Sequence, residues 1–217
     1  MTKGKLGKVP AVVPAKDRLK EVDVPEGRSG PWEVRRFAVS EDEAKRDEFS
    51  ARLAAIQGRP YRPVPAGSYT RIARGGHVVM TDTPSELCDL REPVRRAVGG
   101  RVLVNGLGLG IVLQAVLEEP GVEHLTVVEA SEDVIALVAP HWGARYGDRL
   151  TVVHADAFKW RPPMGARYRV VWHDIWDDVT TDNLAGMRKL HAKYRRRCDW
   201  QGSWCRRECA RLRRIGW

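Results

Sequence analysis

The sequence predicts an α/β fold in which a parallel sheet carries helices on both faces. Short apolar stretches of strand type alternate with helical stretches between residues 101 and 173. A polar residue stands at or just beyond the end of each apolar strand, and a glycine-rich turn, Gly106-Leu-Gly-Leu-Gly110, follows the first one. With 217 residues, the chain can form one domain with an extension, or two small domains.

The N-terminal third predicts a flexible segment followed by a strand and a helix. Residues 1–30 are rich in Lys, Pro, Gly and Val without any period, so we expect a flexible leader there. A weakly alternating strand is expected over residues 31–39. Ser40 and Glu43 have the spacing of a capping box, which opens a helix. That helix carries three apolar side chains on one face: Phe49, Leu53 and Ile56.

A β-hairpin and a helical stretch complete this N-terminal part. Residues 69–73 and 77–81 are two short strand patterns separated by Arg-Gly-Gly, which is typical of a hairpin. Residues 85–98 are predicted to be helical. We therefore assign residues 31–98 to a strand–helix–hairpin module that works as a lid for the following domain.

The following domain, residues 99–197, carries the alternating pattern. Its helices are expected over residues 111–118, from Ser131 onward and over residues 181–197. Little strand pattern follows that last helix, so residues 198–217 are interpreted as a basic tail or helix, and the sheet is expected to be short. The expected strands are residues 101–104, 124–129, 150–154 and 168–173.

The strand ends predict a binding crevice, because the carboxyl ends of parallel strands meet at one edge of the sheet. Gly106, Gly108 and Gly110 form G-x-G-x-G, and the dinucleotide pattern G-x-G-x-x-G fails because Ile111 takes its last position. Glu129 ends the second strand, where a carboxylate accepts hydrogen bonds from both ribose hydroxyls. Asp156-Ala157 follows the third strand and offers an acceptor and a close backbone to an adenine edge. These residues describe a nucleoside site.

Residues 101–178 resemble the class I S-adenosylmethionine (SAM)-dependent methyltransferases, and more closely their spermidine-synthase-like branch. The resemblance implies a Rossmann-like fold with SAM as the cofactor. It implies that the glycine turn lines the methionine part of SAM, while Asp174 faces the transferred group. It is carried by four stretches: Val102-Leu-Val-Asn-Gly-Leu-Gly-Leu-Gly110, Leu125-Thr-Val-Val-Glu-Ala-Ser-Glu-Asp-Val-Ile135, Val152-Val-His-Ala-Asp-Ala157 and Tyr168-Arg-Val-Val-Trp-His-Asp174. The candidate cofactor-binding residues are Asn105, Gly106, Gly108, Gly110, Glu129, Asp156 and Ala157.

Two differences between this sequence and the aminopropyltransferases favour methyl transfer over aminopropyl transfer. The aminopropyltransferases carry an Asp in the glycine turn where this chain has Leu109. Their D-S-S-D-P-like loop reads His173-Asp-Ile-Trp-Asp-Asp178 here. This loop also lacks the motifs of the amino-directed and cytosine-C5 nucleic-acid methyltransferases. The acceptor is therefore left open between a small molecule and a nucleic acid.

Asp174 and Asp177 are the candidate catalytic residues. Methyl transfer moves positive charge to the acceptor, so a carboxylate beside the acceptor stabilises charge as it develops or acts as general base. Trp176 lies between the two acids, where its ring could stack on a base. The structural alternatives are that the acids cap a turn and that Trp176 belongs to the core.

The positive charge is localised. Residues 187–217 hold eleven Arg or Lys and two acids, while the other 186 residues hold 26 of each sign, so the net charge of +9 belongs to the C-terminal part. Such a patch suits a polyanion, and a solvated basic helix is the alternative. Trp200, Trp204 and Trp217 could stack on bases. Alternatively, a stripe of apolar residues docks the last helix on the core: Trp204, Cys209, Leu212 and Ile215.

The composition argues against a membrane, secreted or disulfide-rich protein. The longest uncharged run has 16 residues, too short for a membrane span, and no secretion signal or disulfide framework is visible, so we expect a cytoplasmic protein. No metal site is predicted. A shortened sheet leaves an edge that a second copy could cover, so a homodimer is one expectation. Besides a methyltransferase, two functions stay open: an aminopropyltransferase-like enzyme, and a non-catalytic nucleoside-binding protein whose basic tail holds nucleic acid.

Overall fold

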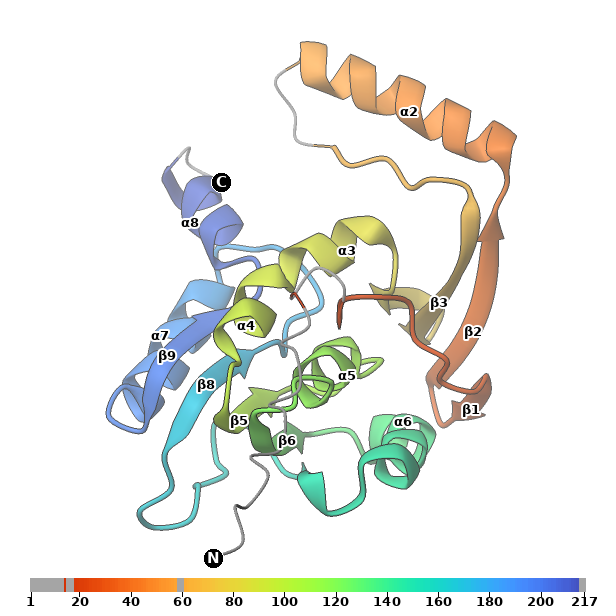
Figure 1. Ribbon diagram of the computed structural model, residues 1–217. Coiled ribbons are helices and arrows are strands. Elements are labelled where there is room, and N and C mark those ends of the chain that lie inside the picture. The colour runs from red at the N-terminus through yellow and green to blue at the C-terminus, as the bar shows by residue number, and fades with distance from the viewer. Residues whose placement is uncertain (1–13, 15–17, 58–60, 215–217) are drawn as a thin grey trace, which may run out of the picture.

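A computed structural model describes residue 14 and residues 18–57 and 61–214 (Figure 1). Its centre is a five-stranded, entirely parallel sheet in the order β7-β6-β5-β8-β9. The sheet therefore starts in the middle and grows outward in both directions, which confirms the predicted α/β, Rossmann-like class. The strands are β5 (Gly100–Asn105), β6 (Val122–Glu129), β7 (Leu150–His154), β8 (Tyr168–His173) and β9 (Cys198–Ser203).

Alternate residues of the central strands pack on opposite faces of this sheet, as a parallel sheet with two covered faces requires. Val102 and Val104 of β5 join the core that includes α4 (Arg91–Arg96), α5 (Ile111–Leu117) and α6 (Glu132–Tyr146). Leu103, between them, packs with residues of α7 (Asn183–Tyr194) on the other face. The short η1 helix (Gly147–Arg149) leads from α6 into β7. All seven residues of α5 are buried.

The N-terminal module is a second, antiparallel sheet in the order β1-β2-β3-β4. Its strands are β1 (Gly27–Ser29), β2 (Trp32–Val39), β3 (Gly67–Arg74) and β4 (His77–Thr81), so the predicted strand and hairpin are present. The predicted capping box of Ser40 and Glu43 opens α2 (Glu41–Ile56). The apolar face of α2 does not enter a core, since Phe49 and Ile56 are 62% and 83% exposed. The helical stretch predicted over residues 85–98 consists of two helices, α3 (Pro84–Asp89) and α4.

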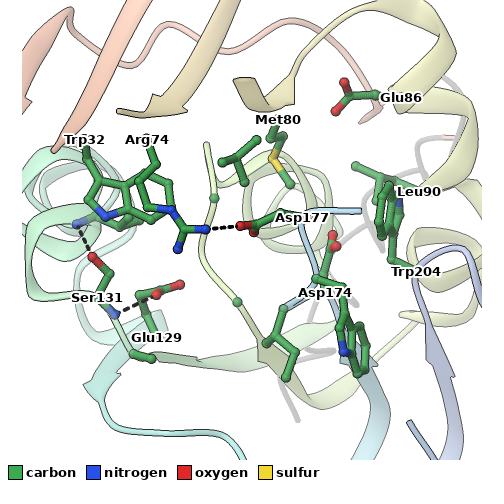
Figure 2. A pocket seen from close by; sticks show the side chains of 17 residues that line it. Trp32, Arg74, Met80, Glu86, Leu90, Glu129, Ser131, Asp174, Asp177 and Trp204 are labelled. Carbon is green, nitrogen blue, oxygen red and sulfur yellow. Dashed lines mark hydrogen bonds and ion pairs between the residues drawn. The ribbon is translucent and has the colours of Figure 1, made fainter. Parts of the chain in front are cut away.

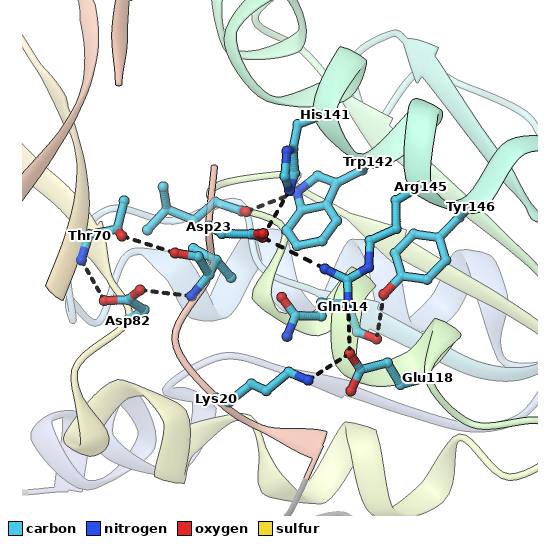
Figure 3. Close-up of polar contacts among 12 residues, drawn as sticks. Lys20, Asp23, Thr70, Asp82, Gln114, Glu118, His141, Trp142, Arg145 and Tyr146 are labelled. Carbon is cyan, nitrogen blue, oxygen red and sulfur yellow. Dashed lines mark hydrogen bonds and ion pairs between the residues drawn. The ribbon is translucent and has the colours of Figure 1, made fainter. Parts of the chain in front are cut away.

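The expectation of a flexible leader over residues 1–30 is wrong from residue 18 onward; residues 1–13 and 15–17 lie outside the described part. Asp82 accepts hydrogen bonds from the backbone N–H groups of Val22 (2.9 Å) and Thr70 (2.6 Å). Further along, Asp23 contacts His141 of α6 at 3.1 Å (Figure 3). Arg18 is buried, 3.4 Å from Glu119. Residues 18–26 lack a period because they run between the antiparallel sheet and the helices of the parallel sheet, and residues 27–29 then form β1.

The expectation that residues 198–217 form a basic tail or helix is wrong for the first six of these residues. Residues 198–203 are β9, which pairs in parallel with β8 at the edge of the sheet. This half-polar edge strand, Cys-Asp-Trp-Gln-Gly-Ser, buries only Ser203 and shows neither alternation nor an apolar run, so a local pattern does not indicate it. The following helix, α8 (Arg206–Arg214), buries Cys209, as the docked alternative expects, while Ile215 lies outside the described residues.

Replacing Gly110 by alanine is expected to destabilise the fold. Gly110 has a φ of +78°, and an added Cβ would lie 2.1 Å from Nε1 of Trp142, whose indole donates to the Leu109 carbonyl at 3.1 Å. Left-handed backbone and overpacking together cost about 2–5 kcal/mol of unfolding free energy. The matched control is Gly143→Ala in α6, where nothing lies within 4 Å. That change should stabilise by about 0.5–1 kcal/mol. Equal denaturation midpoints for both variants would contradict this account.

Candidate functional site

The main candidate site is a pocket of about 370 Å³ at the carboxyl ends of β5, β6 and β8 (Figure 2). Its floor comes from the parallel sheet and the loops that follow these strands. Its cover comes from β2 and the β3–β4 hairpin, which contribute Trp32, Arg74 and Met80. The strand and hairpin thus stand over the site as a lid would, whereas no described residue of α2 lines it. The volume falls within the roughly 300–1,000 Å³ of small-molecule sites.

One end of the pocket is built around Glu129. Its two carboxylate oxygens accept hydrogen bonds from the backbone N–H groups of Leu107 and Ser131, each at 2.8 Å. These bonds hold the carboxylate at the tip of β6, facing the glycine turn. A carboxylate offers about four lone pairs, so about two remain for hydroxyl groups of a ligand. Glu129 can therefore bind a ribose without losing its contacts to the protein.

Two of the predicted glycines line the pocket, and each is closely approached by the protein itself. An added Cβ at Gly106 would lie 1.8 Å from the carbonyl oxygen of Asp174, so this glycine lets the loop after β8 cross the tip of β5. At Gly108 it would lie 2.7 Å from Sδ of Met80, which also accepts the Leu109 N–H at 3.4 Å. The methionine side chain from β4 therefore covers part of the glycine turn.

Four of the predicted cofactor residues do not line this pocket. Asn105 is buried below it, and Gly110 faces Trp142 in the core. The Asp156 carboxylate accepts the Phe158 N–H at 2.7 Å, and the Ala157 carbonyl accepts the Lys193 ammonium at 2.8 Å. The structure thus brings Gly106, Gly108 and Glu129 to the pocket, and leaves the expected adenine contacts outside its wall.

The other end of the pocket is acidic. Burial raises the pKa of Asp174 to about 7, and the negative charges of Glu86 and Asp89 add to the effect. Burial also raises the pKa of Glu86, which accepts hydrogen bonds from the N–H and hydroxyl of Thr81. Trp176 and Trp204 line the same pocket. A carboxyl group with a pKa near neutrality exchanges protons readily at physiological pH, which is the property of a general base.

Asp177 lies between the two ends of the pocket, where an ion pair crosses it. The Asp177 carboxylate accepts a hydrogen bond from the Arg74 guanidinium at 2.6 Å, and that guanidinium lies 5.4 Å from the ring centroid of Trp32 (Figure 2). The pair connects the loop after β8 to the hairpin. It leaves the charge of Asp177 compensated, in contrast to that of Asp174.

A buried polar cluster supports the strand tips from below. Nδ2 of Asn105 and Nδ1 of His173 lie 2.7 Å apart, which links the ends of β5 and β8. Burial lowers the pKa of His173 to about 3, so this imidazole is neutral. His173 is thus a buried strand-end histidine whose ring is held by Asn105. Asn105 thus acts through the position of the loop that carries Asp174, rather than by contact with a ligand.

Sequence reasoning did not single out several lining residues. Glu86, Arg74 and Met80 come from the N-terminal module, where their patterns predict only helix and hairpin. Trp32 begins a strand, and nothing in its neighbours indicates a ligand. Only Trp204 carried a signal, as part of the apolar stripe, and it does pack on the core while also lining the pocket.

No group of three or more His, Cys, Asp or Glu residues within the described ranges could hold a metal ion. Among the same residues, no helix combines the length and apolarity that a bilayer span requires.

No family model matches the chain, and no curated protein matches it. Solved structures do share part of its fold. It is similar to a proposed RNA methyltransferase from Pyrococcus horikoshii, with 14% identity and a TM-score of 0.44 over 59% of this chain and 64% of that one. It is similar to the CcbJ methyltransferase from Streptomyces caelestis, with 24% identity and a TM-score of 0.35 over 43% and 38%. It is also similar to a proposed methyltransferase from Thermoplasma acidophilum, with 21% identity and a TM-score of 0.37 over 44% of this chain and 40% of that one.

The matched region spans less than two thirds of each of these three proteins. At this level the similarity concerns the fold, and it assigns neither a family nor an activity. The described part of the chain has a Rossmann-like α/β fold, with a pocket at the carboxyl ends of its parallel strands and an antiparallel sheet that contributes to the cover of that pocket.

Proposed function

We propose that the protein is a SAM-dependent methyltransferase. The observation that carries the proposal is one cavity with two chemically different ends: Glu129, with lone pairs left for ribose hydroxyls, and Asp174, a carboxyl with a pKa of about 7. The residues at the ribose end fit a nucleoside cofactor. The methionine end of SAM would lie along the glycine turn, where Met80 must first move aside. When bound, SAM supplies a methyl group on a positively charged sulfur.

The chain's own residues would then bind, orient and accept a proton. Glu129 would hold the sugar, and Trp32 and Arg74, which line the pocket from the antiparallel sheet, would help to exclude water. Asp174 is ionised above pH of about 7 and can accept the proton that the acceptor loses on methylation. Orientation of the acceptor can lower the barrier by up to about 7–11 kcal/mol. The acceptor class stays open between a small molecule and a nucleic acid.

Calorimetry and a transfer assay test this proposal. The protein is titrated with SAM, S-adenosylhomocysteine, decarboxylated SAM and NAD, and labelled methyl transfer from SAM into a cell extract is then measured. We expect binding of SAM and S-adenosylhomocysteine, weaker binding of NAD, and label in an acceptor fraction. Preference for decarboxylated SAM would favour aminopropyl transfer, and binding without any transfer would favour the non-catalytic alternative. Absence of binding by all four compounds would contradict the proposal.

The second candidate function, a non-catalytic nucleoside-binding protein, is favoured by one observation. Met80 lies against Gly108 and Leu109, where the methionine end of SAM would lie. If Met80 moves for SAM, Met80→Ala removes the cost of moving it. SAM binding should then tighten about 3- to 10-fold, or about 0.7–1.4 kcal/mol, while adenosine binding stays unchanged. Val78→Ala, in the same strand and 40% exposed in the wild type, is the control. Absence of SAM binding by both the wild type and Met80→Ala, with adenosine still bound by both, would favour the non-catalytic candidate.

A further inference from the structure

The strongest feature outside the pocket is a set of six arginines near the amino ends of the parallel strands, opposite the carboxyl ends that form the pocket. Two hollows of about 640 and 380 Å³ adjoin there and share Arg167. Asp199 is the one acid among the residues that line them. The set, called the arginine surface below, consists of Arg101, Arg167, Arg169, Arg195, Arg196 and Arg197.

Tertiary structure creates this surface from three separate stretches of the chain. Arg101 lies near the start of β5, Arg167 and Arg169 flank the start of β8, and the other three form the turn between α7 and β9. Because β5 and β8 pair in parallel, Arg101 and Arg169 lie at the same end of neighbouring strands. Half of the surface therefore comes from outside the basic C-terminal stretch that the sequence singled out.

Hydrogen bonds hold the arginine surface in place. The turn is tied to β8 by the Tyr168 N–H, which donates to the Arg197 carbonyl at 2.8 Å. The Arg167 guanidinium donates to the Arg196 carbonyl at 3.3 Å. Nearby, the Lys193 ammonium bonds the carbonyls of Ala157, Phe158 and Trp160, which fixes the adjoining loop. A positively charged surface on a fixed backbone loses less freedom on binding than a mobile tail does.

The charges of this surface are mostly uncompensated by the protein. Asp199 contacts Arg167 at 3.6 Å and Arg169 at 3.2 Å, and both pairs are exposed. Among the described residues, the guanidinium groups of Arg101, Arg195 and Arg196 make no ion pair. Six like charges with one counter-charge repel one another, so an anionic partner would relieve an unfavourable arrangement.

We infer that the arginine surface binds the phosphate backbone of nucleic acid. Guanidinium groups bind phosphate through two parallel hydrogen bonds, which favours arginine over lysine at such sites. The two hollows are open and shallow, and they lie side by side, which suits an extended polyanion better than one small phosphate ester. Their single aromatic residue, Tyr168, is buried and offers no ring for base stacking. Recognition is therefore of phosphates and not of base sequence.

This surface is separate from the pocket and does not depend on the proposed methyl transfer. It lies at the amino ends of strands whose carboxyl ends form the pocket, about 20 Å away at about 3.3 Å per residue over the length of β8. Nucleic acid on this surface is thus held away from the pocket, and either function can be lost without the other.

Binding of a fluorescent RNA duplex across salt concentrations tests the inference. The variant R101A/R195A/R196A removes three exposed arginines of the surface. The matched variant R211A/R213A/R214A removes the same charge from α8. We expect the first to weaken binding at least 10-fold and to lower the slope of log K against log salt by about 2–3, at about 0.9 per phosphate. The α8 variant should bind within about 3-fold of wild type.

Three further readouts complete the test. Thermal melting must show both variants folded, and if the first is not, R101K/R195K/R196K replaces it and should still weaken binding, since lysine lacks the paired hydrogen bonds. Equal loss in the surface and α8 variants would overturn the inference, because net charge alone would then explain binding. A salt slope near zero, or equally tight binding of polyglutamate, would also overturn it. SAM binding by the surface variant should equal that of wild type.

Discussion

Replacing Glu129 by glutamine is expected to weaken SAM binding by about 1.5–3 kcal/mol, or roughly 10- to 150-fold. The amide keeps the size of the side chain but loses the charge and one of its two acceptor oxygens. In the wild type both oxygens already accept a backbone N–H at 2.8 Å, so ribose hydroxyls would use the remaining lone pairs. Calorimetry with SAM and S-adenosylhomocysteine measures the loss.

The control for this prediction is Glu123→Gln, an exposed residue near the other end of β6. It should leave SAM affinity unchanged. Glu129→Gln takes the acceptor from one of the N–H groups of Leu107 and Ser131, and Glu129→Ala takes it from both, so both variants should melt below wild type and the alanine variant lower still. An unchanged SAM affinity in Glu129→Gln would place the ribose elsewhere.

Replacing Asp174 by asparagine is expected to lower kcat about 10²- to 10⁴-fold if Asp174 is the general base. Because burial raises the pKa of Asp174 to about 7, the wild-type rate should rise with pH and level off above this value. The asparagine variant should lose this pH dependence. Asp178→Asn, in the same loop but 70% exposed, should keep both the rate and its pH profile. A wild-type rate that does not change between pH 6 and 8 would contradict the assignment.

The same pKa shift makes a prediction about stability. Asp174 has a higher pKa in the folded chain than the ordinary value of 3.8, so the folded state favours its protonated form. The stability that protonation contributes is fully present below pH of about 4 and is lost as pH rises through about 7. Above pH 7, Asp174→Asn should therefore melt at a higher temperature than wild type, while below pH 4 the two should melt together. A lower melting temperature of the variant at pH 8 would show that the carboxylate is stabilised.

Local patterns predicted the secondary structure of the central domain closely. The alternation of apolar strands with helices predicted β5, β6, β7 and β8, since strands covered on both faces consist mainly of apolar residues. The capping box predicted the start of α2, since it involves only Ser40 and Glu43. In contrast, β9 was missed because its polar residues are tolerated at the sheet edge, which a local pattern does not reveal.

The candidate site could be predicted only where it is made by the strand tips. Glu129 and Asp174 follow strands of one parallel sheet, so topology alone brings them to the same edge, and the structure places both in one pocket. Asp156 also follows such a strand, but its carboxylate turns back to its own loop. The parallel arrangement of the strands could be inferred from the sequence, whereas the direction of a side chain in a loop depends on nearby hydrogen bonds.

The amino-acid sequence by itself determined the α/β class, the glycine turn and the acids at the strand ends, because each depends on residues close together in the chain. Only the tertiary structure decided that Met80 and Arg74 cover the pocket, that residues 18–26 join the two units, and that arginines from three stretches form one surface. These contacts join residues far apart in sequence, and packing between whole elements selects them. No local pattern of hydrophobic period or capping carries that information.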